Sequence, residues 1–201
     1  MSRKKHVLFF IILIPVFLFS FMRLGSYFFT AEDVFYACER GLGYGPSDKI
    51  LGEYDLEGRS KLIVGKWNGD LSVVPAEPAF VVLWKLKDGG VSGFIPCEKI
   101  VTGNLLIDGK ILGLVSDREI SEVICQVEYG DYENPLTQQI SMGVDENGFF
   151  GGEWKNQNPD DSYARITYIE GINEQKEVVY RDGMSPEGVY YNNGVQENWG
   201  K

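Results

Sequence analysis

The pattern of apolar and polar positions divides the chain into an N-terminal apolar run and a long body with strand-like alternation. The apolar run covers residues 7–22 and is interrupted only by Pro15 and Ser20. Basic residues precede it, which is the order found in secretory signals and signal anchors. Because no small-residue cleavage site follows the run, we expect residues 1–29 to form an uncleaved transmembrane signal anchor.

Secretion after signal cleavage is the alternative to this anchor. As a helix, the sixteen apolar residues would span about 24 Å, a little short of the ~30 Å core of a bilayer. Arg23 could reach the far headgroups, and Tyr27 and Phe28 could lie at the interface. Three basic residues precede the run and one follows it closely, so the positive-inside rule predicts a single-pass protein of the cell membrane, with a cytoplasmic N-terminus and an extracytoplasmic body.

The body is expected to begin with one short helix near residues 31–40. Thr30 is a suitable N-cap residue, and the acidic Glu32 and Asp33 that follow it suit the positive end of a helix dipole. Gly41 and Gly43 then favour the end of the helix.

Hairpin signals follow the helix and predict a mainly β fold. Asn68-Gly69 lies between two strand-like segments, and Glu57-Gly58 and Asp88-Gly89-Gly90 separate further pairs. Apolar and other residues alternate along 80–86, the period of a half-buried strand. We expect strands at 50–56, 61–67, 70–74, 80–86 and 91–95. Residues 30–103 are therefore predicted to form the helix plus an antiparallel β-meander.

A second series of strand-like segments predicts a small β-sandwich over residues 104–183, with an immunoglobulin-like arrangement as one option. The expected strands are 111–115, 122–129, 138–144, 149–154, 163–170 and 177–181. The boundary between the two β regions is placed at 99–104, although both could share one sheet system. Residues 184–201 are rich in Gly, Asn and Glu, and we expect them to form a flexible tail.

Charge limits the partners of the body. Four of the 19 basic residues precede residue 30, whereas all 29 acidic residues follow it, so residues 30–201 carry a formal charge of −14. Such a surface is unsuited to nucleic acid and is repelled by anionic lipid headgroups. Attachment to the membrane is therefore expected to depend on the N-terminal helix, and no nucleic-acid partner is expected.

The residue types restrict the available chemistry. His6 is the only histidine, so the body lacks histidine-based catalytic triads and histidine zinc sites. The three cysteines have no C-x-x-C spacing; Cys125 lies on the apolar face of a strand, and a Cys97–Cys125 disulfide is possible outside the cell. No glycine motif has the context of a nucleotide-binding loop. We therefore assign no catalytic, cofactor-binding or metal-binding residue.

Two weaker chemical signals remain. Asn156, Asn158, Asp160 and Asp161 alternate as in the start of a calcium loop, but the residues that should follow are absent, and a solvated turn is the simpler interpretation. Paired carboxylates could hydrolyse polysaccharides, with Trp67, Trp84 and Trp154 stacking on sugars. The strand positions of these tryptophans favour core packing instead.

Three segments carry a resemblance to a known group of proteins. The stretch GLGYGPSDK at 41–49, the stretch KLIVGKWNGDLSVVPAE at 61–77 and WKLKDGGVSGF at 84–94 resemble those of small exported or membrane-anchored proteins of Gram-positive bacteria. That group has no assigned activity. The resemblance implies a bacterial envelope setting and assigns no site residue.

Three functions fit these observations. The first is a non-enzymatic binding or interaction module of the cell envelope, which takes up another protein or a wall component at its strand edges. The second is an enzyme that acts on extracellular polymers with carboxylates or calcium, and it requires a cleft where two acids converge. The third is a sensing ectodomain, which would need a partner in the membrane because only six residues precede the apolar run.

Overall fold

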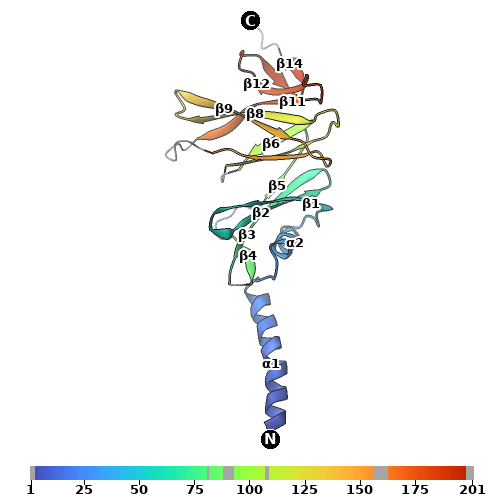
Figure 1. Cartoon of the computed structure of the whole chain (residues 1–201), viewed down its shortest axis with the longest axis vertical. Coiled ribbons are helices and arrows are strands. Elements are labelled where there is room, and N and C mark those ends of the chain that lie inside the picture. Colours follow the sequence, from blue (N-terminus) through green and yellow to red (C-terminus); the bar gives the residue numbers. More distant parts are fainter. Residues whose placement is uncertain (1–2, 81, 88–92, 107–108, 156–162, 198–201) are drawn as a thin grey trace. The chain divides into compact units, whose positions relative to one another are not determined.

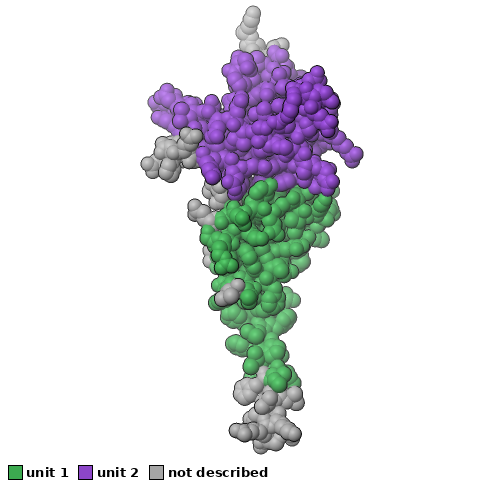
Figure 2. All heavy atoms as spheres, in the orientation of Figure 1, with its two compact units in different colours: residues 1–68, 72–94 green, residues 69–71, 95–201 purple. Residues whose placement is uncertain are grey.

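The computed structural model describes residues 3–80, 82–87, 93–106, 109–155 and 163–197, with side chains throughout except at 3–10 and 57. The chain forms two compact units, residues 1–68 with 72–94 and residues 69–71 with 95–201 (Figure 2). Strands account for 50% of the structure, the strand pairs of the described residues are antiparallel, and these residues hold two α-helices (Figure 1). The expectation of a mainly β chain is confirmed.

The N-terminal apolar run forms helix α1, Arg3–Leu24, which contains Pro15 and ends with Arg23 in its last turn. Its large apolar side chains from Ile11 to Phe21 are between 41% and 69% exposed. The side chains of α1 are described only for residues 11–24. Within the described part of the chain, no helix is long and apolar enough to span a membrane.

The second helix, α2, confirms the prediction of a short helix. It extends over Ala31–Leu42, and the hydroxyl of Thr30 accepts a hydrogen bond from the amide of Asp33 at 3.0 Å, as an N-cap does. Gly43 ends the helix in the left-handed conformation at φ 81°.

The first unit contains a five-stranded sheet with the order β1-β2-β3-β4, in which β5 also pairs with β3. Its strands are β1 (Lys49–Asp55), β2 (Lys61–Trp67), β3 (Asp70–Pro78), β4 (Trp84–Leu86) and β5 (Gly93–Ile95). The turn η1, Glu57–Arg59, joins the first two strands, and Asn68-Gly69 joins β2 to β3, as predicted. The turn expected at 88–90 lies outside the described residues.

One predicted strand of the first unit is wrong over half of its length. The alternation along 80–86 predicts a strand, but of the described residues in this range only Trp84–Leu86 are in a strand, and Phe80 and Val82 are exposed. Strand β3 continues to Pro78, which pairs with Trp84, so the chain must reverse between them. The amide of Ala79 donates to the carbonyl of Leu83 at 2.9 Å and closes this turn.

A buried carboxylate fixes α2 to the loop that follows it. Glu39 is fully buried, and it accepts hydrogen bonds from the amide of Ser47 at 2.8 Å and from the Ser47 hydroxyl at 2.5 Å. Gly45 packs closely on the same carboxylate. A Cβ at this position would lie only 2.7 Å from Glu39 Oε2. A buried carboxylate is tolerated when such donors satisfy it. The Glu39 side chain on α2 therefore holds the helix to the loop that contains Ser47.

The second unit contains a three-stranded sheet of order β10-β7-β6 and a six-stranded sheet of order β14-β13-β12-β11-β8-β9. The small sheet is formed by β6 (Val101–Leu105), β7 (Lys110–Val115) and β10 (Phe149–Glu153). The large sheet is formed by β8 (Glu122–Gly130), β9 (Pro135–Gly143), β11 (Ala164–Ile172), β12 (Val178–Met184), β13 (Tyr190–Asn192) and β14 (Val195–Glu197). Residues of both sheets share one hydrophobic core.

The second unit differs from the sequence-based expectation at both of its ends. Strand β6 was not expected, and the boundary placed at 99–104 falls across it, whereas the second unit begins at residue 95. The expected tail from 184 on contributes β13 and β14 to the large sheet. The hairpin of β13 and β14 closes at Asn193-Gly194, and Gly194 donates to the carbonyl of Arg181 on β12.

Two glycines on the small sheet allow a large ring to lie inside the second unit. Gly103 pairs with Gly113, and Gly113 pairs with Phe150, so all three are neighbours across the sheet. A Cβ on Gly113 would lie 2.1 Å from Cζ of Phe150, and one on Gly103 would lie 3.2 Å from Cδ1 of Ile169 on β11. The fully buried Phe150 ring therefore occupies space that side chains would take.

We predict that Glu39→Ala lowers the free energy of unfolding by about 2–3 kcal/mol, because it leaves the buried Ser47 amide and hydroxyl without their acceptor. Glu39→Gln keeps the shape and one acceptor oxygen, so it should cost less than half as much. Urea unfolding of the full chain in detergent, followed by near-ultraviolet circular dichroism, measures both. Equal losses in the two variants would contradict the assigned role.

Candidate functional site

The small sheet covers only part of the inner face of the large sheet. Strand β10 contacts β9, and β6 contacts β11, so the three strands of the small sheet lie over β9, β8 and β11. On the next strand, β12, alternate residues share one face. Tyr180 on that face belongs to the core, whereas Asp182 and Met184 line an open groove. The groove therefore lies on the inner face of the large sheet, beyond the part that the small sheet covers.

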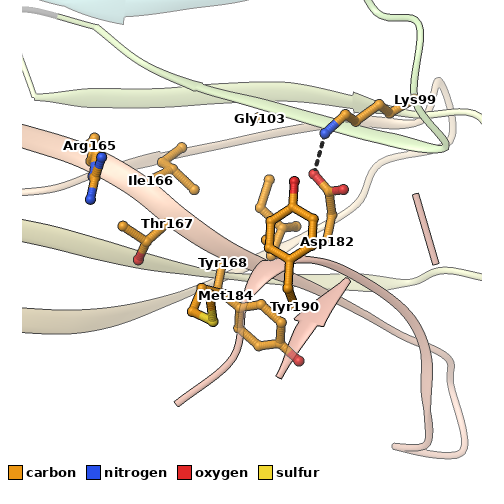
Figure 3. A pocket seen from close by; sticks show the side chains of 11 residues that line it. Lys99, Gly103, Arg165, Ile166, Thr167, Tyr168, Asp182, Met184 and Tyr190 are labelled. Atoms are coloured by element: carbon orange, nitrogen blue, oxygen red, sulfur yellow. Dashed lines mark hydrogen bonds and ion pairs between the residues drawn. The ribbon is translucent and has the colours of Figure 1, made fainter. Parts of the chain in front are cut away.

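We call this feature the β6 groove. It has a volume of about 460 Å³ and opens to solvent (Figure 3). Its walls come from the segment before β6 and from β6, β11, β12 and β13 (Lys99, Gly103, 165–169, 182–184 and Tyr190). In Figure 3, Arg165 lies on the opposite side of the groove from Lys99 and Asp182. The volume lies within the range of roughly 300–1,000 Å³ that ligand sites occupy.

The edge of β6 faces the groove with backbone groups. Hydrogen bonds from the Leu106 amide to the Lys110 carbonyl and from the Ser116 amide to the Ile100 carbonyl mark the two ends of the ladder with β7. In an antiparallel ladder, hydrogen-bonded pairs alternate with pairs that point outward. Val101, Gly103 and Leu105 therefore direct their amide and carbonyl groups away from β7. The backbone of Val101 indeed hydrogen-bonds to Tyr180 on β12.

A network of polar groups closes one end of the groove. The carboxylate of Asp182 accepts from Nζ of Lys99 at 2.6 Å and from the amide of Asn193 at 2.9 Å. The side-chain oxygen of Asn193 accepts from the amide of Ile100 at 3.2 Å and from Oη of Tyr180 at 3.3 Å. The C-terminal hairpin is thereby joined to the segment that leads into β6.

Arg165 stands at the other end of the groove in a fixed position. Its guanidinium donates to the carboxylate of Glu128 at 3.0 Å and lies 5.4 Å from the ring centroid of Tyr163. Oη of Tyr163 donates to the same carboxylate at 2.8 Å. The side chain of Arg165 is nevertheless 57% exposed, so a basic group remains accessible to an incoming carboxylate.

Two tyrosines beside the groove remain neutral phenols at physiological pH. Burial, followed by the negative charge of Asp182, raises the pKa of Tyr180 to about 12. Burial and a hydrogen bond to Glu170 raise the pKa of Tyr168 well above its ordinary value. These groups act as hydrogen-bond donors rather than as bases or nucleophiles.

The residues considered from sequence do not gather into a catalytic centre. Cys38, Cys97 and Cys125 carry reduced thiols, and burial raises the pKa of Cys125 to about 12, so its thiol stays protonated. Trp154 is buried in the core of the second unit, and Trp84 packs on that of the first. Trp67 instead contacts Tyr44 and Phe94 in a partly exposed ring cluster.

The β6 groove does not bring two carboxylates together, and the described residues form no cluster of metal ligands. The β6 groove is lined by a single carboxylate, Asp182, whereas hydrolysis by paired acids needs two. Across the described ranges no group of three or more His, Cys, Asp or Glu side chains could hold a metal ion. The calcium-like segment 156–161 lies outside those ranges.

Sequence reasoning missed the residues that build the groove, although two signals were present. A glycine within a strand marks close approach of another group, and Gly103 on β6 is such a residue. Asn193-Gly194 is the same turn signal that correctly placed the hairpin at Asn68-Gly69. Its flanking segments are only three residues long, which hid the strands.

Comparison with protein-family models, with curated proteins and with solved structures gives no match. The resemblance to small exported proteins of Gram-positive bacteria therefore stays a prediction, and the function has to be argued from the groove and its surroundings.

We predict that Asn193→Gly lowers the free energy of unfolding by about 1–2 kcal/mol, because two hydrogen bonds to its side chain are lost while glycine keeps the turn. Asn68→Gly is the matched control, since Asn68 forms the corresponding turn in the first unit at φ 52°, against 46° for Asn193. Urea unfolding followed by tryptophan fluorescence compares the two variants. Equal effects would show that the network does not stabilise the second unit.

Proposed function

We propose that this chain is a membrane-held, non-enzymatic binding module that accepts an extended segment of a partner protein in the β6 groove. The segment would lie beside β6 as a fourth strand of the small sheet and would cover the inner face of β12 and β13. The observation that carries this proposal is the open edge of β6, whose outward backbone groups border a groove of about 460 Å³.

Strand addition fits the backbone geometry of this edge. A strand that pairs with β6 would take up the outward amide and carbonyl groups of Gly103 and Leu105. The second unit is then an incomplete sandwich, since three strands face six, and the partner segment supplies the missing strand.

The groove also indicates which side chains the partner segment carries. Met184 is 48% exposed at the groove and lies opposite Tyr190 in the pairing of β12 with β13. Alternate residues of an extended segment would point toward this surface, so apolar residues at every second position would be favoured. A carboxylate near the exposed guanidinium of Arg165 would form a charge-assisted hydrogen bond.

The tether rests on the character of α1. A helix of 22 residues measures about 33 Å, close to the ~30 Å hydrocarbon core of a bilayer. The exposed apolar side chains from Ile11 to Phe19 would lose contact with water in lipid, at roughly 1.5–3 kcal/mol for each large one. Three basic residues before the apolar run and one after it favour a cytoplasmic N-terminus and an extracytoplasmic body. The resemblance to small Gram-positive exported proteins supports an envelope setting.

The proposal is tested with random linear peptides displayed as a library and selected on the full chain in detergent. Selected peptides should show apolar residues at alternate positions, and Met184→Arg should weaken their binding about tenfold or more, or about 1.4 kcal/mol. Leu136→Arg is the matched control, because Leu136 is an apolar residue, 57% exposed, on β9, an edge strand of the large sheet. Loss of binding with Leu136→Arg alone would place the binding at β9 and contradict the proposal.

A further inference from the structure

Apolar side chains gather on the first unit where α1 ends. Leu24 is 89% exposed, Phe29 is 65% exposed, and on the turn between β3 and β4 Phe80 is 54% and Val82 is 66% exposed. Together with Tyr27 we call these residues the end surface. Single exposed apolar residues are ordinary, but a contiguous group of them marks a contact surface.

Ring contacts join the turn directly to the helix. The Tyr27 ring stacks on Phe21 of α1 with centroids 5.4 Å apart, and it forms a T-shaped pair with Phe80 at the same centroid distance. Phe21 and Phe80 are also neighbours, at 6.3 Å. The exposed apolar surface of α1 therefore continues without a break into the turn.

Backbone pairing fixes the chain that leaves α1 to the first sheet. Phe28 and Trp84 exchange two hydrogen bonds of 2.8 Å in an isolated antiparallel bridge. Trp84 begins β4 directly after the turn, so the bridge holds the turn beside the exit of the helix. The end surface is thus a fixed part of the first unit.

The region around the end surface differs in charge from the acidic remainder of the body. Residues 19–30 and 79–83 contain no Asp or Glu, although residues 30–201 carry a formal charge of −14. Arg23, whose guanidinium lies 6.0 Å from the Phe19 ring centroid, is their only charged residue. The region thus lacks the carboxylates that anionic headgroups would repel, and it carries one group that they attract.

We propose that the end surface lies in the lipid interface, so that Phe80 and Val82 make a second membrane contact beside the helix. This inference rests on the proposed tether, which brings the surface to the outer end of α1. Aromatic rings that are apolar on one side and polar on another favour the headgroup level, as Tyr27 does. A lipid interface also accounts for the continuity with α1 and for the absence of acidic residues, which binding of a second copy does not require.

The test places an environment-sensitive nitrobenzoxadiazole label at position 82 of the full chain. Cys38→Ser and Cys97→Ser remove the two partly exposed thiols, whereas the buried Cys125, with its raised pKa, does not react. Val82→Cys then carries the label. Val195→Cys is the matched control, because Val195 is also a valine with 66% exposure and lies on β14 in the second unit.

Both proteins are reconstituted in vesicles of phosphatidylcholine and phosphatidylglycerol that contain headgroup-level spin-labelled lipid. The label at 82 should show a blue-shifted emission and strong quenching by this lipid, and the label at 195 should show neither. Adding Phe80→Glu should reduce the quenching at 82 to the level of the control, while Phe80→Leu should preserve it.

Flotation of the same vesicles after a carbonate wash separates the two claims. If the protein floats but the label at 82 is not quenched, the tether stands and the second contact is wrong. If the protein does not float, the tether fails and the second contact with it. Shielding of position 82 that requires a high protein-to-lipid ratio would assign the surface to a second copy of the chain and would also overturn the inference.

Discussion

The ring of Phe150 lies across the glycine pair Gly103 and Gly113, and this contact determines how closely β6 approaches β11. A Cβ at either glycine would meet Phe150 or Ile169 at a distance of 3.5 Å or less. Because both positions lack side chains, the small sheet packs directly on the large one and shares its core. The position of β6 over β11 then leaves Tyr190 on β13 and the part of β12 from Asp182 to Met184 uncovered, and the β6 groove is the result.

The same constraint links packing to recognition. Gly103 permits the close approach on the core side, and its backbone faces the groove on the edge side. The edge of a sheet normally needs protection against pairing with other chains. Here Tyr180 occupies only the Val101 end of the edge, while the Asp182 and Asn193 network secures the entry to β6. An edge that is firmly held at one end and open along the rest is suited to accept one further strand.

The sequence predicted the parts whose signals are local. Thr30 and Gly43 delimited α2, and Asn68-Gly69 placed the hairpin of β2 and β3, because caps and tight turns depend on a few adjacent residues. Phe80 and Val82 were misassigned because their alternation matches that of a half-buried strand, whereas both side chains are exposed in the turn that Ala79 and Leu83 close. Strand β6 was missed because Gly103 weakens its strand propensity, and the reason for that glycine is a contact with Phe150, distant in sequence. The groove depends on which strands lie over one another, which no local pattern contains.

The central claim is that an extended segment pairs with the edge of β6. Amide hydrogen exchange, measured by nuclear magnetic resonance on the full chain in detergent with a library-selected peptide bound, tests it most directly. The amides of Gly103 and Leu105 should exchange much more slowly with peptide than without it, whereas Thr102 and Asn104, which already pair with β7, should change little. Unchanged exchange at Gly103 and Leu105, or slowing confined to β9, would contradict the account.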